Sequence, residues 1–170
     1  MRVETVLTEE QLASRIWELA REIRCAYADS TPMLLSLLKG SIFFLADLAR
    51  ALGNGFPIEF MAVASYNGTR STRAVEIRLD ICTNIEGRDV LIVEDIVETG
   101  LTLEYLLGVL KARGAASVRV VTLLFKPGAF QGTERPDFIG FELPNDYVVG
   151  YGMDLNEEWR NMRFVGRLAQ

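Results

Sequence analysis

The spacing of apolar residues near the amino terminus predicts an amphipathic helix. Leu12, Ile16, Leu19 and Ile23 recur three or four positions apart, which places them on one face of a helix. Thr8 stands before them, and a threonine hydroxyl can accept hydrogen bonds from the free amides of a first helical turn. We therefore expect a helix from residue 8 to residue 28 with Thr8 as its N-cap.

Further along the chain, apolar runs separated by turn residues predict strands that alternate with helices. We expect strands at 33–38, 58–65, 75–79, 90–93 and 117–125, and helices from 42 to about 52 and from 102 to 113. Strand–helix–strand order is typical of an α/β protein with a central parallel sheet flanked by helices. The polar segment 66–73 is predicted to be a long, mobile loop, with 75–79 returning as the second arm of a hairpin.

After Lys126 the pattern changes to short segments interrupted by glycine and proline. Residues 138–142 and 147–151 are predicted strands, and we expect this part to form a small lobe rather than an extension of the sheet. The chain has 170 residues, of which 49% are hydrophobic, enough for one well-buried core. We therefore expect a single domain spanning 1–170.

Composition narrows the classes of function. A net charge of −5 at pH 7 argues against a general nucleic-acid binder, which needs a basic surface. The sequence has no histidine, which excludes the commonest general base and the commonest transition-metal ligand. Acid–base chemistry would have to use carboxylates, lysine, tyrosine or cysteine.

The cysteines and the hydropathy pattern predict a cytoplasmic protein with no membrane partner. Cys25 and Cys82 stand far apart without a CxxC spacing, so neither a zinc site nor a disulfide framework is indicated. No apolar run reaches signal-peptide or membrane-span length.

The segment VLIVEDIVETGLTL, residues 90–103, carries the clearest candidate chemistry. A buried strand leads into the carboxylates of Glu94, Asp95 and Glu98, and then into a turn that opens a helix. Gly100 permits close backbone approach, and the hydroxyls of Thr99 and Thr102 add donors to the free amides, which suits a phosphate. Neither standard phosphate-binding motif is present. On the residues alone, a solvated acidic loop explains this stretch equally well.

Six blocks in order resemble one family. They are "LLKGS" at 37–41, "ASYNG" at 64–68, the segment 90–103, "FKPG" at 125–128, "RPDFIGFELPNDYVVGYGMD" at 135–154 and "NEEWRNM" at 156–162. Together they resemble the purine phosphoribosyltransferases, specifically the bacterial hypoxanthine-guanine branch, in which the block at 90–103 binds phosphoribosyl pyrophosphate.

The resemblance implies a fold and a reaction. The fold would be the type I phosphoribosyltransferase fold, with a hood formed by the amino-terminal segment and roughly residues 126–170. The reaction would transfer the phosphoribosyl group of phosphoribosyl pyrophosphate to a 6-oxopurine, hypoxanthine or guanine, in purine salvage. It would depend on Mg²⁺ and take place in a homodimer or homotetramer.

The resemblance also assigns residues to the phosphoribosyl group and the metal. Its sugar and 5′-phosphate would be bound by Glu94, Asp95, Val97, Glu98, Thr99, Gly100, Leu101 and Thr102. Mg²⁺ would be bound by Glu94, Asp95 and Asp154. Glu98 would be the general base that takes a proton from purine N7. The family has aspartate at that position, and glutamate is longer by one methylene.

The remaining assignments concern the leaving group, the base and a lid. Pyrophosphate would be held by Lys39, Gly40 and Arg160, with a non-proline cis peptide before Lys39. The purine would contact Lys126, Tyr147 and Val148, and Ser65 and Tyr66 would form the hinge of a lid over 66–73. Each feature also has an ordinary structural explanation, such as an exposed turn lysine, a surface arginine, a core tyrosine, an Asx turn at Asp154 or a hairpin tip.

Two other functions compete with the enzyme. A regulator that senses phosphoribosyl pyrophosphate would keep the fold without catalysis, and only the glutamate at position 98 favours it. An α/β domain with an acidic surface loop would explain the composition but not six blocks in order.

Overall fold

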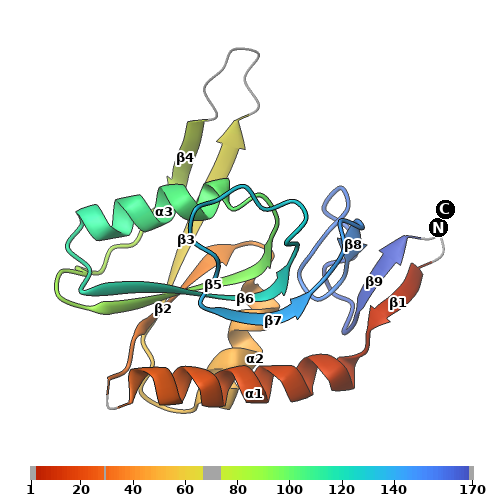
Figure 1. The fold of residues 1–170 in the computed structure, drawn as a ribbon, viewed down its shortest axis with the longest axis horizontal. Helices are drawn as coiled ribbons and strands as arrows, with labels where there is room; N and C mark the ends of the chain where they lie inside the picture. The colour runs from red at the N-terminus through yellow and green to blue at the C-terminus, as the bar shows by residue number, and fades with distance from the viewer. Residues whose placement is uncertain (1–2, 29, 67–73, 169–170) are drawn as a thin grey trace.

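Two sheets organise the computed structural model, which describes residues 3–28, 30–66 and 74–168 (Figure 1). The larger sheet has six strands in the order β4-β3-β2-β5-β6-β7, and only β3 and β4 run antiparallel. Its strands are β2 (Met33–Leu38), β3 (Ile58–Tyr66), β4 (Ala74–Leu79), β5 (Asp89–Val97), β6 (Ser117–Phe125) and β7 (Phe138–Glu142). The predicted α/β class with a mainly parallel central sheet is confirmed.

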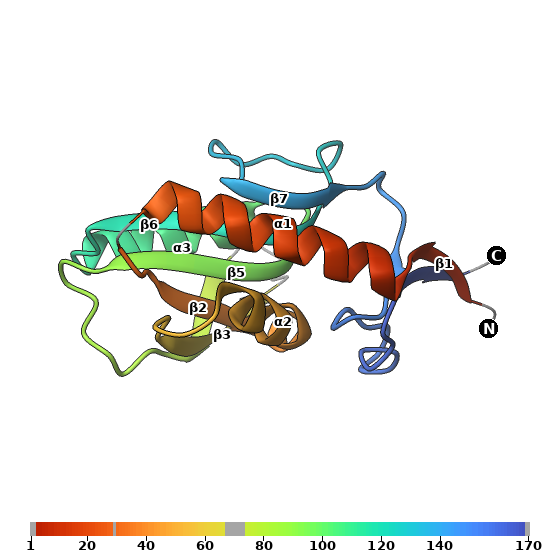
Figure 2. The same cartoon turned by 90° about the horizontal axis from the view of Figure 1, so that it is seen from below.

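Helices cover both faces of this sheet. They are α1 (Glu9–Tyr27), α2 (Ile42–Leu52) and α3 (Leu101–Ala112). Helices α1 and α2 lie together on one face and α3 lies on the other (Figures 1 and 2). The bounds of all three agree with the predictions to within a residue.

Alternating side chains of the central strands explain this layering. Leu34 and Leu91 belong to the core cluster under α1 and α2, whereas their neighbours Leu35 and Ile92 belong to the cluster under α3. Successive residues of a strand point to opposite faces, so a strand covered on both sides is apolar throughout. This accounts for the unbroken apolar runs in the sequence.

The first helix begins as predicted. The Thr8 hydroxyl accepts from the Gln11 amide at 3.3 Å, and the Gln11 side chain accepts from the Thr8 amide at 2.8 Å. This reciprocal capping box satisfies two amides that the helix itself leaves without partners.

The smaller sheet joins the two ends of the described chain. It has the order β1-β9-β8 and consists of β1 (Val3–Leu7), β8 (Val148–Val149) and β9 (Val165–Leu168). Val3 is paired with Leu168, so the first and last described residues lie side by side. The predicted strand 147–151 is confirmed only at Val148 and Val149.

The prediction that no main-sheet strand follows Lys126 is wrong. Strand β7 pairs parallel with β6, with Phe138 opposite Val121, and forms an edge of the large sheet. The loop that contains Lys126 and Gly128 is therefore a crossover between two sheet strands. The sequence pattern identified the strand at 138–142 but carried no signal for its pairing partner.

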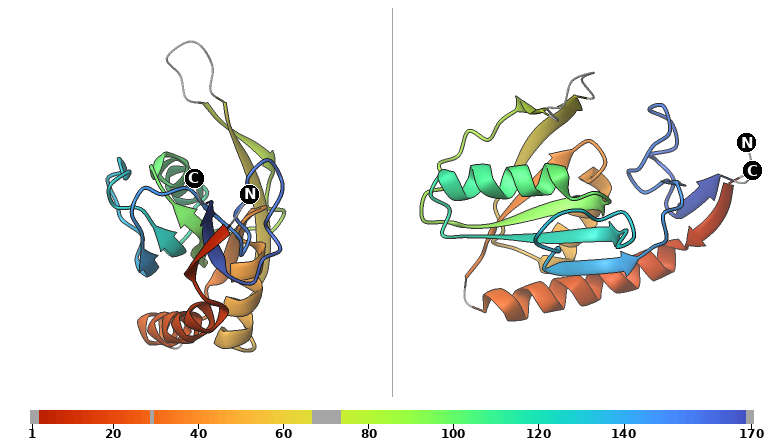
Figure 3. Two further views of the ribbon diagram at one scale, coloured as in Figure 1. Left: turned by 90° about the vertical axis from the view of Figure 1, so that its right-hand side faces the viewer. Right: turned by 45° about the horizontal axis from the view of Figure 1, so that its top comes forward.

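The carboxyl ends of the parallel strands point toward the smaller sheet (Figure 3). Ligands of open α/β sheets bind at such ends, beside the amino termini of the following helices. The predicted lid falls largely outside the described residues, because 67–73 are not among them. The hinge residues Ser65 and Tyr66 end β3 and are paired with Val75 and Ala74 of β4. None of the described helices is both long and apolar enough to cross a membrane.

Candidate active site

Strand β5 is longer than predicted and contains two of the acidic residues. The acidic residues were predicted to follow the strand, but β5 extends to Val97 and includes both Glu94 and Asp95. Only Glu98, Thr99 and Gly100 form the turn before α3. Because alternate strand residues face opposite sides, Glu94 and Asp95 reach the end of the sheet from different faces.

A pocket of about 240 Å³ lies at the start of α3. It is lined by Glu94, Ile96, Val97, Glu98, Thr99, Gly100, Thr102 and Leu103. Of the residues predicted to bind the phosphoribosyl group, the pocket thus includes all but Asp95 and Leu101. Its lining combines carboxylates with hydroxyls and the free amides of a helix amino terminus. The amides and hydroxyls attract anions.

Gly100 gives this turn its shape. Its φ angle is +78°, and a Cβ placed there would come within 2.3 Å of Cε2 of Phe130. Only glycine adopts this left-handed conformation at little cost and leaves room for the ring. Gln131 also donates its amide to the Thr99 carbonyl at 2.9 Å, which ties the crossover after β6 to the turn.

Lys126 and Glu98 meet at the edge of this pocket. The Lys126 ammonium contacts the Glu98 carboxylate, and the side-chain exposures are 5% and 48%. The Lys126 amide donates to the Val97 carbonyl at 3.0 Å, which fixes the lysine beside the end of β5. The residues predicted to bind the purine oxygen and to take the purine proton are therefore direct neighbours.

Asp95 lies against the loop that follows β2. A Cβ on Gly40 would stand 1.9 Å from Oδ2 of Asp95, and a Cβ on Gly152 would stand 1.9 Å from the Gly40 carbonyl oxygen. The end of β5, the loop after β2 and the turn after β8 therefore lie in contact. The loop and the turn can come this close because they have glycine at the contact points. The peptide bond between Leu38 and Lys39 is cis, as predicted.

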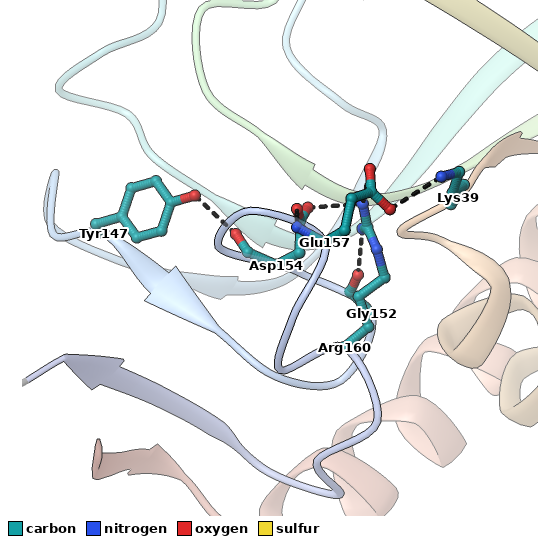
Figure 4. A network of polar contacts seen from close by, with 6 residues as sticks. All are labelled: Lys39, Tyr147, Gly152, Asp154, Glu157 and Arg160. Atoms are coloured by element: carbon teal, nitrogen blue, oxygen red, sulfur yellow. Dashed lines mark hydrogen bonds and ion pairs between the residues drawn. The ribbon is translucent and has the colours of Figure 1, made fainter. Parts of the chain in front are cut away.

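A polar network connects this loop to the turn after β8 (Figure 4). Nζ of Lys39 lies 2.9 Å from Oε2 of Glu157, and Nη2 of Arg160 lies 3.5 Å from Oε1 of the same carboxylate. Nη2 of Arg160 also lies 2.7 Å from Oδ1 of Asp154, and its Nη1 donates to the Gly152 carbonyl at 2.8 Å. The two predicted pyrophosphate ligands thus share one anionic partner.

The predicted base-stacking residue lies next to the same turn. Tyr147 is 56% exposed, and its hydroxyl donates to the Asp154 carbonyl at 2.7 Å. Val148 is buried in β8. The exposed ring is anchored by its hydroxyl and has a free face for stacking. Tyr147 is therefore not a core residue.

Burial raises the pKa of both carboxyls at the end of β5. The pKa of Glu94 lies well above its ordinary value because of desolvation, and the negative charge of Asp95 adds to the effect. Desolvation also raises the pKa of Asp95 to about 6, against the opposing effect of its backbone hydrogen bonds and of Arg160. A bound cation would stabilise both charged forms.

Comparison with known proteins agrees with this geometry. The phosphoribosyl transferase domain model matches residues 2–157. A hypoxanthine-guanine phosphoribosyltransferase of Bacillus subtilis is 42% identical over 164 residues, covering 96% of this chain and 91% of the relative. One of Mycobacterium avium is 46% identical over 170 residues, covering 96% and 84%. The crystal structure of a Bacillus anthracis hypoxanthine-guanine phosphoribosyltransferase superposes with a TM-score of 0.93 at 35% identity, covering 98% of each chain.

The chain belongs to the phosphoribosyl transferase family. The resemblance of the six blocks is thereby confirmed, and so is the fold class. In this phosphoribosyltransferase, the ends of β2, β5 and β6 and the turn after β8 bring together residues from five of the six blocks.

Glu94 and Asp95 are less engaged than Asp154 and could each bind a metal ion, one from each face of the sheet. Among the described residues, neither Glu94 nor Asp95 has an ion pair, and half-buried carboxylates without a cation suit a hard ion such as Mg²⁺. Both oxygens of Asp154 are engaged, one with Arg160 and the other with the Glu157 amide at 2.9 Å. The described residues contain no cluster of three metal-ligating side chains, so substrate oxygens would have to complete the coordination.

Two residues of this site were missed in the sequence. Gly152 allows the turn after β8 to approach Gly40 closely, and its φ angle is +105°. The glycine in "GYGMD" is a sequence signal for such a backbone conformation. Glu157 was not singled out, because nothing in the local sequence distinguishes it from the neighbouring Glu158. A larger cavity of about 570 Å³, between α1, α2 and the segment 161–163, contains none of the predicted site residues.

Proposed function

We propose that this phosphoribosyltransferase acts on phosphoribosyl pyrophosphate and a 6-oxopurine, hypoxanthine or guanine, and forms the nucleoside monophosphate and pyrophosphate. Relatives named hypoxanthine-guanine phosphoribosyltransferase, at 42% and 46% identity, support this substrate class. A role in purine salvage follows from it.

The contact between Lys126 and Glu98 carries the proposal. On a 6-oxopurine, O6 and N7 are neighbours on one edge of the ring. A lysine that donates to O6 and a carboxylate that accepts the N7 proton must therefore lie side by side, as these two do. Adenine has an amino group in place of O6. This amino group and the Lys126 ammonium are both hydrogen-bond donors and would face each other without an acceptor. Unpaired buried donors discriminate strongly between substrates.

The proposed reaction balances with these groups. The bond between C1 of the ribose and the pyrophosphate oxygen breaks, and the electron pair leaves with pyrophosphate. Purine N9 forms the new bond to C1, and the N7 proton passes to the Glu98 carboxylate. Lys39 and Arg160 would stabilise the charge that develops on the leaving group, as preorganised cations do for departing phosphates.

The remaining substrate contacts follow from the pocket at the start of α3. The 5′-phosphate would accept from the amides and hydroxyls between Thr99 and Thr102, where the helix terminus favours negative charge. The ribose hydroxyls would lie toward Glu94. Tyr147 would stack on the purine, and the backbone of Val148 would contact its edge.

We propose Mg²⁺ as the cofactor, held by Glu94 and Asp95 together with oxygens of phosphoribosyl pyrophosphate. Magnesium is commonly bound by one or two carboxylates plus substrate phosphates. When bound, the ion would neutralise charge on the diphosphate. Asp154 would be a further ligand, because each of its carboxylate oxygens keeps a lone pair beside its contact with Arg160 or with the Glu157 amide.

Other parts of the proposal rest on the family resemblance alone. A cytoplasmic location and a homodimeric or homotetrameric state stay predictions, as does a lid hinged at Ser65 and Tyr66. The sensor without catalysis has no supporting observation beyond glutamate at position 98. Lys126 and Glu98, which are assigned to the purine, exceed what binding of phosphoribosyl pyrophosphate alone would require.

The test is a panel of bases. The protein is incubated with phosphoribosyl pyrophosphate, Mg²⁺ and hypoxanthine, guanine, xanthine or adenine, with and without excess EDTA. Monophosphate should form from hypoxanthine or guanine, not from adenine, and should stop with EDTA. Binding of phosphoribosyl pyrophosphate without product from any base would favour the sensor instead.

A further inference from the structure

The carboxylate of Glu157 lies between the two cations assigned to pyrophosphate. One oxygen is 2.9 Å from Nζ of Lys39, and the other is 3.5 Å from Nη2 of Arg160 (Figure 4). These cations come from segments 121 residues apart in the chain, the loop after β2 and the turn after β8. A phosphate oxygen bound by both cations would have to compete with this bridging carboxylate.

The backbone around Glu157 holds the carboxylate in this place. Asn156, Glu157 and Trp159 have φ angles of +53°, +67° and +76°, a region that residues other than glycine adopt at a cost. The Glu157 amide donates to Oδ2 of Asp154 at 2.9 Å, and Leu155 and Glu158 exchange backbone hydrogen bonds. These hydrogen bonds fix the backbone of the turn, and from it the exposed Glu157 side chain reaches the two cations.

We propose that Glu157 is an internal anion, which occupies the pyrophosphate seat in the substrate-free protein and is displaced when the diphosphate binds. This inference rests on the proposed function and adds a residue that sets the affinity for the diphosphate. Glu157 would also return to Lys39 and Arg160 as pyrophosphate leaves, and so lower the affinity for that product.

The exposure of the pair suits such an exchange. The side chains of Lys39 and Glu157 are 68% and 65% exposed, and ion pairs in water are weak enough to open readily. The hydrogen bond from Lys39 holds the pKa of Glu157 below its ordinary value, so the carboxylate is charged when pyrophosphate competes with it. Pyrophosphate carries more charge and more oxygens than one carboxylate and therefore displaces it.

The experiment measures pyrophosphate binding directly. Titration calorimetry with magnesium pyrophosphate is carried out on the wild type, on Glu157→Gln and on Glu158→Gln. Glu158 has no ion pair among the described residues, so its variant makes the same charge change one residue away. Glu157→Gln should bind pyrophosphate roughly three- to tenfold more tightly because it no longer competes for Lys39 and Arg160. Glu158→Gln should stay within about twofold of the wild type.

Two results would overturn the inference. If Glu157→Gln binds pyrophosphate equally or more weakly, Glu157 positions Lys39 rather than competing with the ligand. If both variants tighten binding equally, the effect is general electrostatics. Glu157→Asn, which removes the charge and tolerates a positive φ, provides a second variant if the first does not fold. Wild-type nucleotide formation is measured in parallel, so failure of the proposed function would be seen separately.

Discussion

Lys126 and Glu98 form an ion pair at the mouth of the phosphate pocket, with the lysine almost wholly buried and the glutamate half exposed. By resemblance to the family, aspartate would stand where this chain has Glu98, and glutamate is longer by one methylene. The Glu98 carboxylate reaches the Lys126 ammonium directly. Purine binding would then insert O6 and N7 beside a pair that is already assembled.

Replacing Glu98 by glutamine tests the general base. Glu98→Gln should lower kcat by roughly two orders of magnitude or more, because the amide cannot take the N7 proton. Binding of phosphoribosyl pyrophosphate, measured by calorimetry, should stay nearly unchanged. Glu98→Asp keeps the carboxylate and should retain turnover within about tenfold. Wild-type turnover in the glutamine variant would remove Glu98 from the mechanism.

Lys126→Met tests recognition of the purine oxygen. Loss of the donor should raise the KM for hypoxanthine by roughly 10- to 100-fold and reduce the discrimination against adenine. The matched control is Lys111→Met, because Lys111 is exposed and pairs only with Glu134 at 3.5 Å among the described residues. Steady-state kinetics with both bases would distinguish the two variants. Equal KM values for Lys126→Met and wild type would contradict the assignment.

The sequence predicted more of the fold than of the site's arrangement. Unbroken apolar runs marked the buried strands, and Thr8 marked the start of α1, since these signals depend on local chemistry. The extension of β5 through Glu94 and Asp95 could not be predicted, because strand pairing at the end of the sheet outweighs the low strand propensity of acidic residues. The contacts of Glu157 with Lys39 and Arg160 join segments that include residues far apart in the chain. Local sequence patterns do not predict such contacts.

A pair of glycine substitutions in and beside α3 tests the phosphate turn. Gly100→Ala places a Cβ at φ +78° and within 2.3 Å of the Phe130 ring, so it should destabilise the fold by about 1–2 kcal/mol. It should also raise the KM for phosphoribosyl pyrophosphate. Gly108→Ala has free space around its Cβ and should stabilise the helix by roughly 0.5–1 kcal/mol. Denaturant unfolding measures both, and unchanged stability of Gly100→Ala would contradict the strain argument.

The raised pKa of Asp95 predicts how stability depends on pH. Since its folded pKa is about 6, above the ordinary 3.8, the charged carboxyl disfavours folding. This penalty appears as pH rises through that interval and is complete above about pH 6. Asp95→Asn should therefore be more stable than the substrate-free wild type at pH 7.5, by on the order of 1–3 kcal/mol, and should melt at a higher temperature. The difference should vanish below the ordinary pKa of 3.8.

Asp80 provides the control of opposite sign. Hydrogen bonds from Arg113 at 2.7 Å lower the pKa of Asp80, so its charged form stabilises the fold and this contribution is lost as pH falls through the lowered pKa. Asp80→Asn should accordingly lower the melting temperature at pH 7.5 and converge with the wild type in acid. Melting curves from about pH 2.5 to pH 8 would show both trends, because the contribution of Asp80 is lost only below its ordinary pKa of 3.8. Destabilisation by Asp95→Asn at pH 7.5 would contradict the desolvation argument.

The most direct measurement quantifies both products of one reaction. Wild-type protein is incubated with hypoxanthine, phosphoribosyl pyrophosphate and Mg²⁺, and inosine monophosphate and pyrophosphate are measured over time. Transfer to the purine predicts that the two appear in equal amounts, with the rate reduced at least about a hundredfold in Glu98→Gln. Pyrophosphate without inosine monophosphate, or neither product, would contradict the central claim that this site joins a 6-oxopurine to the phosphoribosyl group.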